Sequence, residues 1–296
     1  MIYYLFFPVY DAWEAMTMYF LLLASVVSLW IPKLNKVWPG FYLLALAFGL
    51  LDGRVTPAAW IPIALLAACT FLKAHFDMGV LLKAAVNLTI FVIGIDMFYH
   101  IMPGFHNWKI LSQYTVSTEG APFNLYLNVD KITVGLFLAS GLLPLCQVKE
   151  EWTLAVKKAL WILPLAALSL MGITLLLGYV SWDPKLPAIT PLWLLTNLFF
   201  VSFTEEVFYR GFIQNQIFSI VGDRSNGKWL AISASAVLFG INHFPGGITY
   251  IFLSAFAGLF YGYGYDATKR IETSILIHFG VNTLHFFFFT YPSILT

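Results

Sequence analysis

Charged residues are scarce in this chain. Asp, Glu, Lys and Arg make up 10% of its 296 residues, whereas hydrophobic residues make up 60%, and the mean hydropathy is +0.80. Soluble globular domains carry about 25% charged residues, so the composition excludes an ordinary soluble domain. It is typical of a multi-pass integral membrane protein, and the lipid bilayer is the first partner that we expect.

The low net charge and the small number of cysteines exclude other classes of protein. The formal net charge is only +1, whereas a nucleic-acid partner requires a concentrated basic face; we therefore expect no nucleic-acid partner. The chain has two cysteines, Cys69 and Cys146, and both lie in apolar runs without a CxxC spacing or a nearby histidine ligand pattern. These cysteines predict neither a disulfide nor a metal site.

Long apolar runs make up most of the sequence. A helix needs roughly 20 residues to cross about 30 Å of hydrocarbon, and about ten runs approach that length. They are residues 13–31, 38–51, 57–72, 84–102, 131–146, 158–180, 190–220, 229–243, 248–265 and 272–292. We predict an all-α fold, a polytopic transmembrane helical bundle of about eight to ten helices.

A proline-rich segment divides this bundle. Residues 182–191 contain three prolines, which interrupt helices. We therefore expect N-terminal transmembrane helices in residues 1–187 and a catalytic transmembrane core, formed by the last four helices, in residues 188–296. Residues 103–130 are the only long polar segment and are expected to form a loop.

The most informative residues are two adjacent carboxylates inside an apolar run. Glu205 and Glu206 lie within residues 192–212, and Arg210 follows one turn later. Charges in such surroundings cost several kcal/mol unless they are paired or hydrated, so they indicate function. Glu206 and Arg210 are i,i+4 neighbours in the favourable order, while Glu205 points about 100° away. The spacing predicts one neutralised carboxylate and one free carboxylate.

Two shorter patterns follow in later apolar runs. Phe239 and His243 are four residues apart at the end of one run, and His278 and Asn282 are four residues apart in the last run. A carboxylate and an imidazole on separate helices can share and deprotonate a water molecule. A second histidine and an amide can donate hydrogen bonds to a developing oxyanion.

Each pattern also has a structural interpretation. Glu206 and Arg210 could be a buried ion pair, and His243 could be an interfacial residue. His278 with Asn282, and likewise Asp96 with His100, could supply interhelical hydrogen bonds. The small residues Ser254, Gly258 and Gly262, spaced by four, predict a stripe of close helix packing.

The ordered set of Glu-Glu-x-x-x-Arg, Phe-x-x-x-His and His-x-x-x-Asn resembles that of the CAAX protease and bacteriocin-processing family. The surrounding sequences Phe-Tyr-Arg-Gly-Phe-Ile-Gln and Phe-Gly-Ile-Asn-His-Phe are similar to family sequences as well. The resemblance covers about residues 190–285. Its members are intramembrane glutamic endopeptidases and include the type II CAAX prenyl endopeptidases.

The resemblance implies a role for each motif residue. Glu205 and His243 would hold and activate the attacking water, and His278 and Asn282 would stabilise the oxyanion. Glu206 and Arg210 would support the site and could also contact the substrate. It further implies a peptidase without metal or other cofactor, acting in a bacterial cell membrane near the terminus of a hydrophobic or lipid-modified peptide or protein substrate.

Three alternatives remain open from the residues themselves. Glu and His on facing helices could bind zinc, although no His-Glu-x-x-His helix is present and Arg210 lies beside the carboxylates. A transporter also places charges at mid-membrane, but with broken helices in two related halves, whereas these charges are confined to one half. The third alternative is a non-catalytic membrane scaffold or sensor of the same family.

Overall fold

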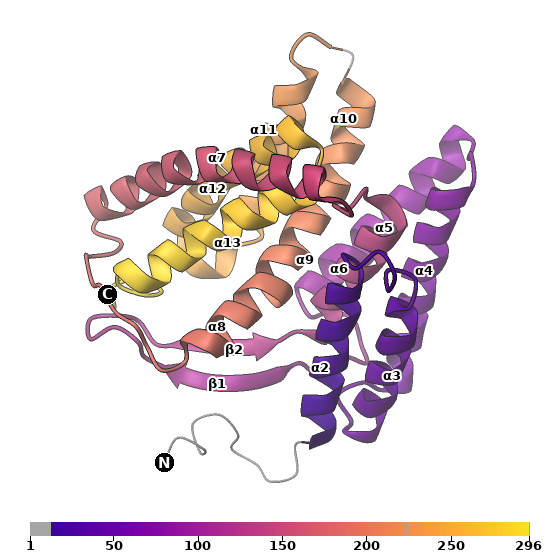
Figure 1. The fold of residues 1–296 in the computed structure, drawn as a ribbon, viewed down its shortest axis with the longest axis horizontal. Helices are drawn as coiled ribbons and strands as arrows, with labels where there is room; N and C mark the ends of the chain where they lie inside the picture. Colours follow the sequence, from indigo (N-terminus) through magenta and orange to yellow (C-terminus); the bar gives the residue numbers. More distant parts are fainter. Residues whose placement is uncertain (1–12, 223, 296) are drawn as a thin grey trace. The chain divides into compact units, whose positions relative to one another are not determined.

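The computed structural model describes residues 13–222 and 224–295, and its ribbon is drawn in Figure 1. Helices occupy every apolar run that the sequence indicated, which confirms the all-α, helical-bundle prediction. Among the described residues, four helical spans are long and apolar enough to cross a membrane: Pro57–His75, Val80–Phe98, Lys149–Leu176 and Phe244–Thr268. Three apolar helices are shorter: Trp13–Ser28, Trp38–Leu51 and Gly227–Ile241.

The chain forms two compact units, which comprise residues 1–110 with 125–143, and residues 111–124 with 144–296. In the described part of the first unit the helices are α2 (Trp13–Ser28), α3 (Trp38–Leu51), η1 (Pro57–Ala59), α4 (Trp60–His75), α5 (Val80–Phe98) and α6 (Val129–Leu142). Helix α2 packs against α3, and α4 packs against α5 and α6.

Two features in and next to the polar segment 103–130 differ from expectation. It contains a two-stranded sheet of β1 (Trp108–Tyr114) and β2 (Phe123–Leu127) instead of only a loop. Nor does His100 pair with Asp96. It follows the end of α5 with a positive φ of 59°, and its Nδ1 lies 2.6 Å from Oδ2 of Asp130. The helix ends before His100, so the i,i+4 relation to Asp96 does not form.

The second unit contains the motif residues. Its first helix is α7 (Lys149–Leu176). This helix starts before the expected apolar run, because Glu151 accepts the backbone N–H groups of Gln147 and Val148 and caps the helix. Helix α7 packs against the last two helices and so belongs to this unit, although it precedes residue 188. The catalytic-core boundary at residue 188 stays a prediction.

One continuous helical stretch carries the two carboxylates. It runs through α8 (Thr190–Thr196), η2 (Asn197–Ser202), α9 (Phe203–Glu206), η3 (Val207–Gln214) and α10 (Asn215–Val221). Both η2 and η3 are π-helical, a rare geometry that is frequent at functional sites. Side chains satisfy carbonyls in these turns: the Thr204 hydroxyl donates to Phe200 O, and the Ser235 hydroxyl donates to Tyr209 O.

Three more helices complete the unit: α11 (Gly227–Ile241), α12 (Gly247–Thr268), preceded by the short η4 (Phe244–Gly246), and α13 (Ile271–Phe288). Helix α12 packs against α7, α11 and α13, and Figure 1 shows α7, α12 and α13 side by side. A Cβ added at Gly258 would lie 3.0 Å from Cα of Ala236. The small residue at position 258 therefore lets α11 and α12 approach closely.

Candidate active site

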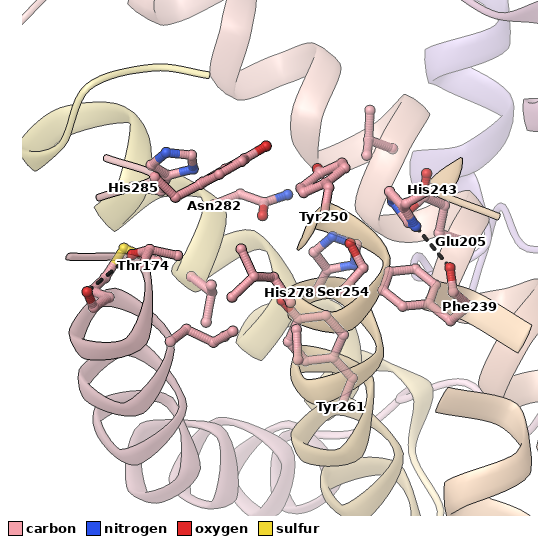
Figure 2. Close-up of a pocket in the computed structure, with 17 residues that line it drawn as sticks. Thr174, Glu205, Phe239, His243, Tyr250, Ser254, Tyr261, His278, Asn282 and His285 are labelled. Atoms are coloured by element: carbon pink, nitrogen blue, oxygen red, sulfur yellow. Dashed lines mark hydrogen bonds between the residues drawn. The ribbon is translucent and has the colours of Figure 1, made fainter. Parts of the chain in front are cut away.

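A cavity of about 110 Å³ lies among the helices of the second unit. One buried water needs roughly 10–15 Å³ of such a cavity, so the cavity has room for several water molecules or a short substrate segment. Figure 2 shows the residues that line it. The polar ones are Thr174, Tyr179, Glu205, His243, Tyr250, Ser254, Tyr261, His278, Asn282 and His285.

Glu205 places a carboxylate oxygen without a hydrogen-bond partner at this cavity. It lies on α9 and is 5% exposed. Its Oε2 has no hydrogen-bond partner among residues 13–222 and 224–295. A buried carboxylate oxygen without a donor is costly, and the adjoining cavity has the volume for a water that would supply one. This oxygen is therefore available to act on a bound water.

Glu206, by contrast, is fully engaged. Its Oε1 lies 2.8 Å from Nδ1 of His278, and its Oε2 accepts the hydroxyl of Ser274 at 2.6 Å. Nε of Arg210 is 3.2 Å from the same Oε2, and both of these side chains are 0% exposed. The two adjacent carboxylates thus have different surroundings, as the helical spacing predicted.

Arg210 joins three helices at a buried position. Besides its ion pair with Glu206, its Nη2 donates to the carbonyl of Gly258 on α12 at 3.1 Å. Its guanidinium carbon lies 4.4 Å from the ring centroid of Phe239 on α11, which is within the range of a cation–π interaction. Arg210 therefore fixes the position of Glu206 relative to α11 and α12.

His243 is held in one tautomer. Its Nδ1 lies 2.8 Å from the carbonyl oxygen of Phe239, one turn earlier, and Figure 2 draws this bond as a dashed line. A carbonyl only accepts, so Nδ1 carries the proton and Nε2 of the neutral ring is an acceptor. The Phe239 and His243 rings also meet edge to face at 4.6 Å. The Phe-x-x-x-His pattern thus orients the imidazole.

His278 is held by Glu206 and by an aromatic ring. Because the Glu206 carboxylate accepts, Nδ1 of His278 donates to it, and Nε2 is the ring nitrogen that remains. His278 lines the cavity. The imidazole stacks on Tyr261 of α12, with centroids 4.6 Å apart and planes 13° apart. Both contacts restrict rotation of this side chain.

Asn282 is oriented by a residue that no motif indicated. Its Nδ2 donates to Oδ1 of Asn197 at 3.3 Å, and the hydroxyl of Ser202 donates to the same oxygen at 3.4 Å. Since Oδ1 of Asn197 accepts, the amide group of Asn282 is assigned with its NH₂ on that side. The second N–H of Asn282 remains as a donor.

The structure therefore brings Glu205, His243, His278 and Asn282 to one cavity, with Glu206 and Arg210 behind it. Sequence reasoning missed Asn197, which lies in a π-helical turn, and His285, which lines the cavity. His285 had a signal that was overlooked: it follows Asn282 by three residues and so lies on the same face of the last helix.

Within the described residues, no group of three or more His, Cys, Asp and Glu side chains is placed to hold a metal ion. The metal-independent mechanism stays a prediction, which chelation can test.

Comparison with known proteins finds one family match. Residues 187–284 match the family model described as type II CAAX prenyl endopeptidase Rce1-like. This match supports the CAAX protease family for the region. The matched residues include every motif residue, and the match supports a peptidase, a hydrolase in the membrane. No curated protein and no solved structure matches the chain.

Proposed function

We propose that this protein is an intramembrane glutamic endopeptidase, in which Glu205 and His243 activate a water for attack on a peptide carbonyl. The observation that carries the proposal is the contrast between the two carboxylates. Glu206 is engaged by three side chains, whereas Oε2 of Glu205 has no partner in the described part of the chain and borders a cavity that can hold water.

The orientation of the water follows from the two acceptors. One water can donate one O–H to Oε2 of Glu205 and the other to Nε2 of His243, which leaves an oxygen lone pair for the substrate carbonyl carbon. Glu205 takes the proton as the C–O bond forms. It then returns the proton to the departing amine as the C–N bond breaks.

His278 and Asn282 complete the proposal as donors to the oxyanion. With Nδ1 donating to Glu206, Nε2 of His278 can donate to the oxyanion in the imidazolium form, in which both ring nitrogens carry a proton. Asn282 contributes the N–H that Asn197 does not use. Loss of one such donor typically lowers kcat by about 10²–10³-fold, so substitution of either residue is expected to lower turnover strongly.

The surroundings of the site support a membrane-associated peptide or protein as substrate. A helical segment hides its carbonyls in hydrogen bonds, so the scissile bond must lie in an extended segment, and helix termini provide unpaired backbone groups. Aromatic and aliphatic side chains, among them Phe239, Leu170 and Val281, form much of the cavity wall. We propose cleavage near the terminus of a hydrophobic or lipid-modified chain, in a bacterial cell membrane.

Mapping of protein termini tests this function without assuming a substrate. Membrane proteomes of cells that produce the wild-type protein and the Glu205→Ala variant would be compared for chain termini that depend on Glu205. The proposal expects such termini near the membrane-proximal ends of hydrophobic or lipidated proteins. Termini confined to soluble proteins would contradict it, and identical termini in both cells would favour the non-catalytic scaffold.

A further inference from the structure

A third histidine lines the cavity, and the mechanism proposed above does not use it. His285 lies on α13 three residues after Asn282 and seven after His278, a spacing that places all three on one helical face. Figure 2 shows His285 beyond Asn282, on the side of the cavity away from Glu205 and His243. It therefore lies beside the proposed oxyanion site and away from the attacking water.

The tautomer of His285 follows from its backbone contact. Its Nε2 lies 3.2 Å from the carbonyl oxygen of Thr290. A carbonyl only accepts, so Nε2 carries the proton, and Nδ1 of the neutral ring is an acceptor without a proton. His285 thus offers the cavity a neutral hydrogen-bond acceptor, unlike the proposed donors His278 and Asn282.

The contacts of His285 are themselves anchored. The Thr290 backbone N–H donates to Ser181 O at 2.9 Å, and the hydroxyls of Thr290 and Ser181 are 2.5 Å apart. The imidazole also packs on the ring of Tyr291 at 5.3 Å, and the Tyr291 hydroxyl accepts from Nε1 of Trp193 on α8. The carbonyl of Thr290 therefore fixes one edge of the imidazole, and the Tyr291 ring fixes one face. A side chain that positions a ligand needs such support.

An extended substrate needs such an acceptor. Unwinding the segment around the scissile bond frees backbone N–H groups, and an unpaired N–H in a desolvated site is costly. Three residues along α13 correspond to a rise of about 4.5 Å, and one residue of an extended chain spans about 3.3 Å. A group held at His285 would therefore lie one or two residues from the carbonyl held at Asn282.

We propose that His285 is a substrate-binding residue, whose Nδ1 accepts a hydrogen bond from a backbone N–H one or two residues from the scissile bond. This inference rests on the proposed function, because it takes the oxyanion site at Asn282 as its reference point. His285 would then recognise an extended substrate backbone. The cavity would select unwound peptide whatever side chains stand at the one or two substrate residues beside the scissile bond.

Ester substitution tests this contact directly. The probes are peptides from a cleavage site found by terminus mapping, reconstituted in liposomes with the full-length protein. Each backbone N–H near the scissile bond, but not the scissile bond itself, is replaced in turn by an ester oxygen. With the wild-type protein, one ester is expected to lower kcat/KM about tenfold, which corresponds to about 1.4 kcal/mol.

The variants decide whether His285 makes the contact. In His285→Phe the kcat/KM values of the sensitive ester peptide and of the matching amide peptide should differ by less than about twofold, because the side chain no longer offers an acceptor. His285→Asn keeps an acceptor near the position of Nδ1 and should retain much of the difference. Thr283→Ala, on the same helix but outside the cavity lining, should behave as wild type. Equal ester penalties in wild type and in His285→Phe, or no sensitive position at all, would overturn the proposal.

A binding measurement separates this inference from the proposed function. Dissociation constants of the amide and ester peptides would be measured for Glu205→Gln and for Glu205→Gln combined with His285→Phe. Continued cleavage by Glu205→Gln would refute the water-activation mechanism alone. The His285 inference predicts that the ester weakens binding to the single variant about tenfold and leaves binding to the double variant unchanged, and equal weakening in both would contradict it.

Discussion

Glu206 Oε1 and His278 Nδ1 lie 2.8 Å apart, although the two residues are separated by 72 positions in the chain. This contact joins the Glu-Glu-x-x-x-Arg helix to the His-x-x-x-Asn helix. The Glu206 carboxylate therefore has a role distinct from that of Glu205. It fixes the imidazole of His278 and balances the charge of Arg210. The following predictions test that division of roles.

Glu206→Gln is expected to destabilise the protein strongly. Arg210 is 0% exposed, and removal of one partner of a buried ion pair typically costs about 3–5 kcal/mol, because the other charge is left buried. Thermal unfolding in detergent measures this loss. Glu205→Gln is the matched control and should unfold near the wild-type temperature, since its carboxylate has no ion-pair partner among the described residues. Equal stability of both variants would contradict the assignment.

Gly258→Ala should impair both stability and cleavage. The added Cβ would lie 2.9 Å from Nη2 of Arg210 and 3.0 Å from the Ala236 backbone, which cannot move aside as a flexible side chain could. The substitution is therefore expected to separate α11 from α12 and to shift Arg210. Gly172→Ala on α7 is the control, because nothing lies within 4 Å of its added Cβ. Wild-type unfolding and turnover of Gly258→Ala would be inconsistent with this packing.

Asn197→Ala is predicted to lower kcat about tenfold with little change in KM. Its Oδ1 orients Asn282, and interactions made only in the transition state affect kcat and kcat/KM together. Asn197→Asp keeps an acceptor and should recover much of the rate. In an Asn282→Ala background the Asn197→Ala change should have little further effect. Additive losses in the double variant would show that Asn197 acts independently of Asn282.

Chelation is expected to leave cleavage intact. A water held by Glu205 and His243 requires no cation, so protein treated exhaustively with a chelator should keep its turnover. Loss of activity that only zinc restores would favour the zinc protease instead.

The sequence predicted local relations better than tertiary ones. The pairing of Glu206 with Arg210 follows from helical spacing alone, as does the separate direction of Glu205. The contacts of Asn197 with Asn282 and of His278 with Glu206 join distant segments, which a single sequence does not specify. Likewise, apolar periodicity does not distinguish the π-helical turns from regular helix. The place of His285 beside Asn282, by contrast, follows from their i,i+3 spacing on one helix.

The most direct test of the central claim is the turnover of Glu205→Gln, purified as a monodisperse species, on a membrane-embedded substrate peptide. Glutamine keeps the size of the side chain but cannot take the proton from water. A general base contributes typically 10²–10⁴-fold, so the account predicts a loss of at least about a hundredfold with unfolding behaviour like that of the wild type. Turnover close to that of the wild-type protein would contradict the assignment of Glu205 as the base.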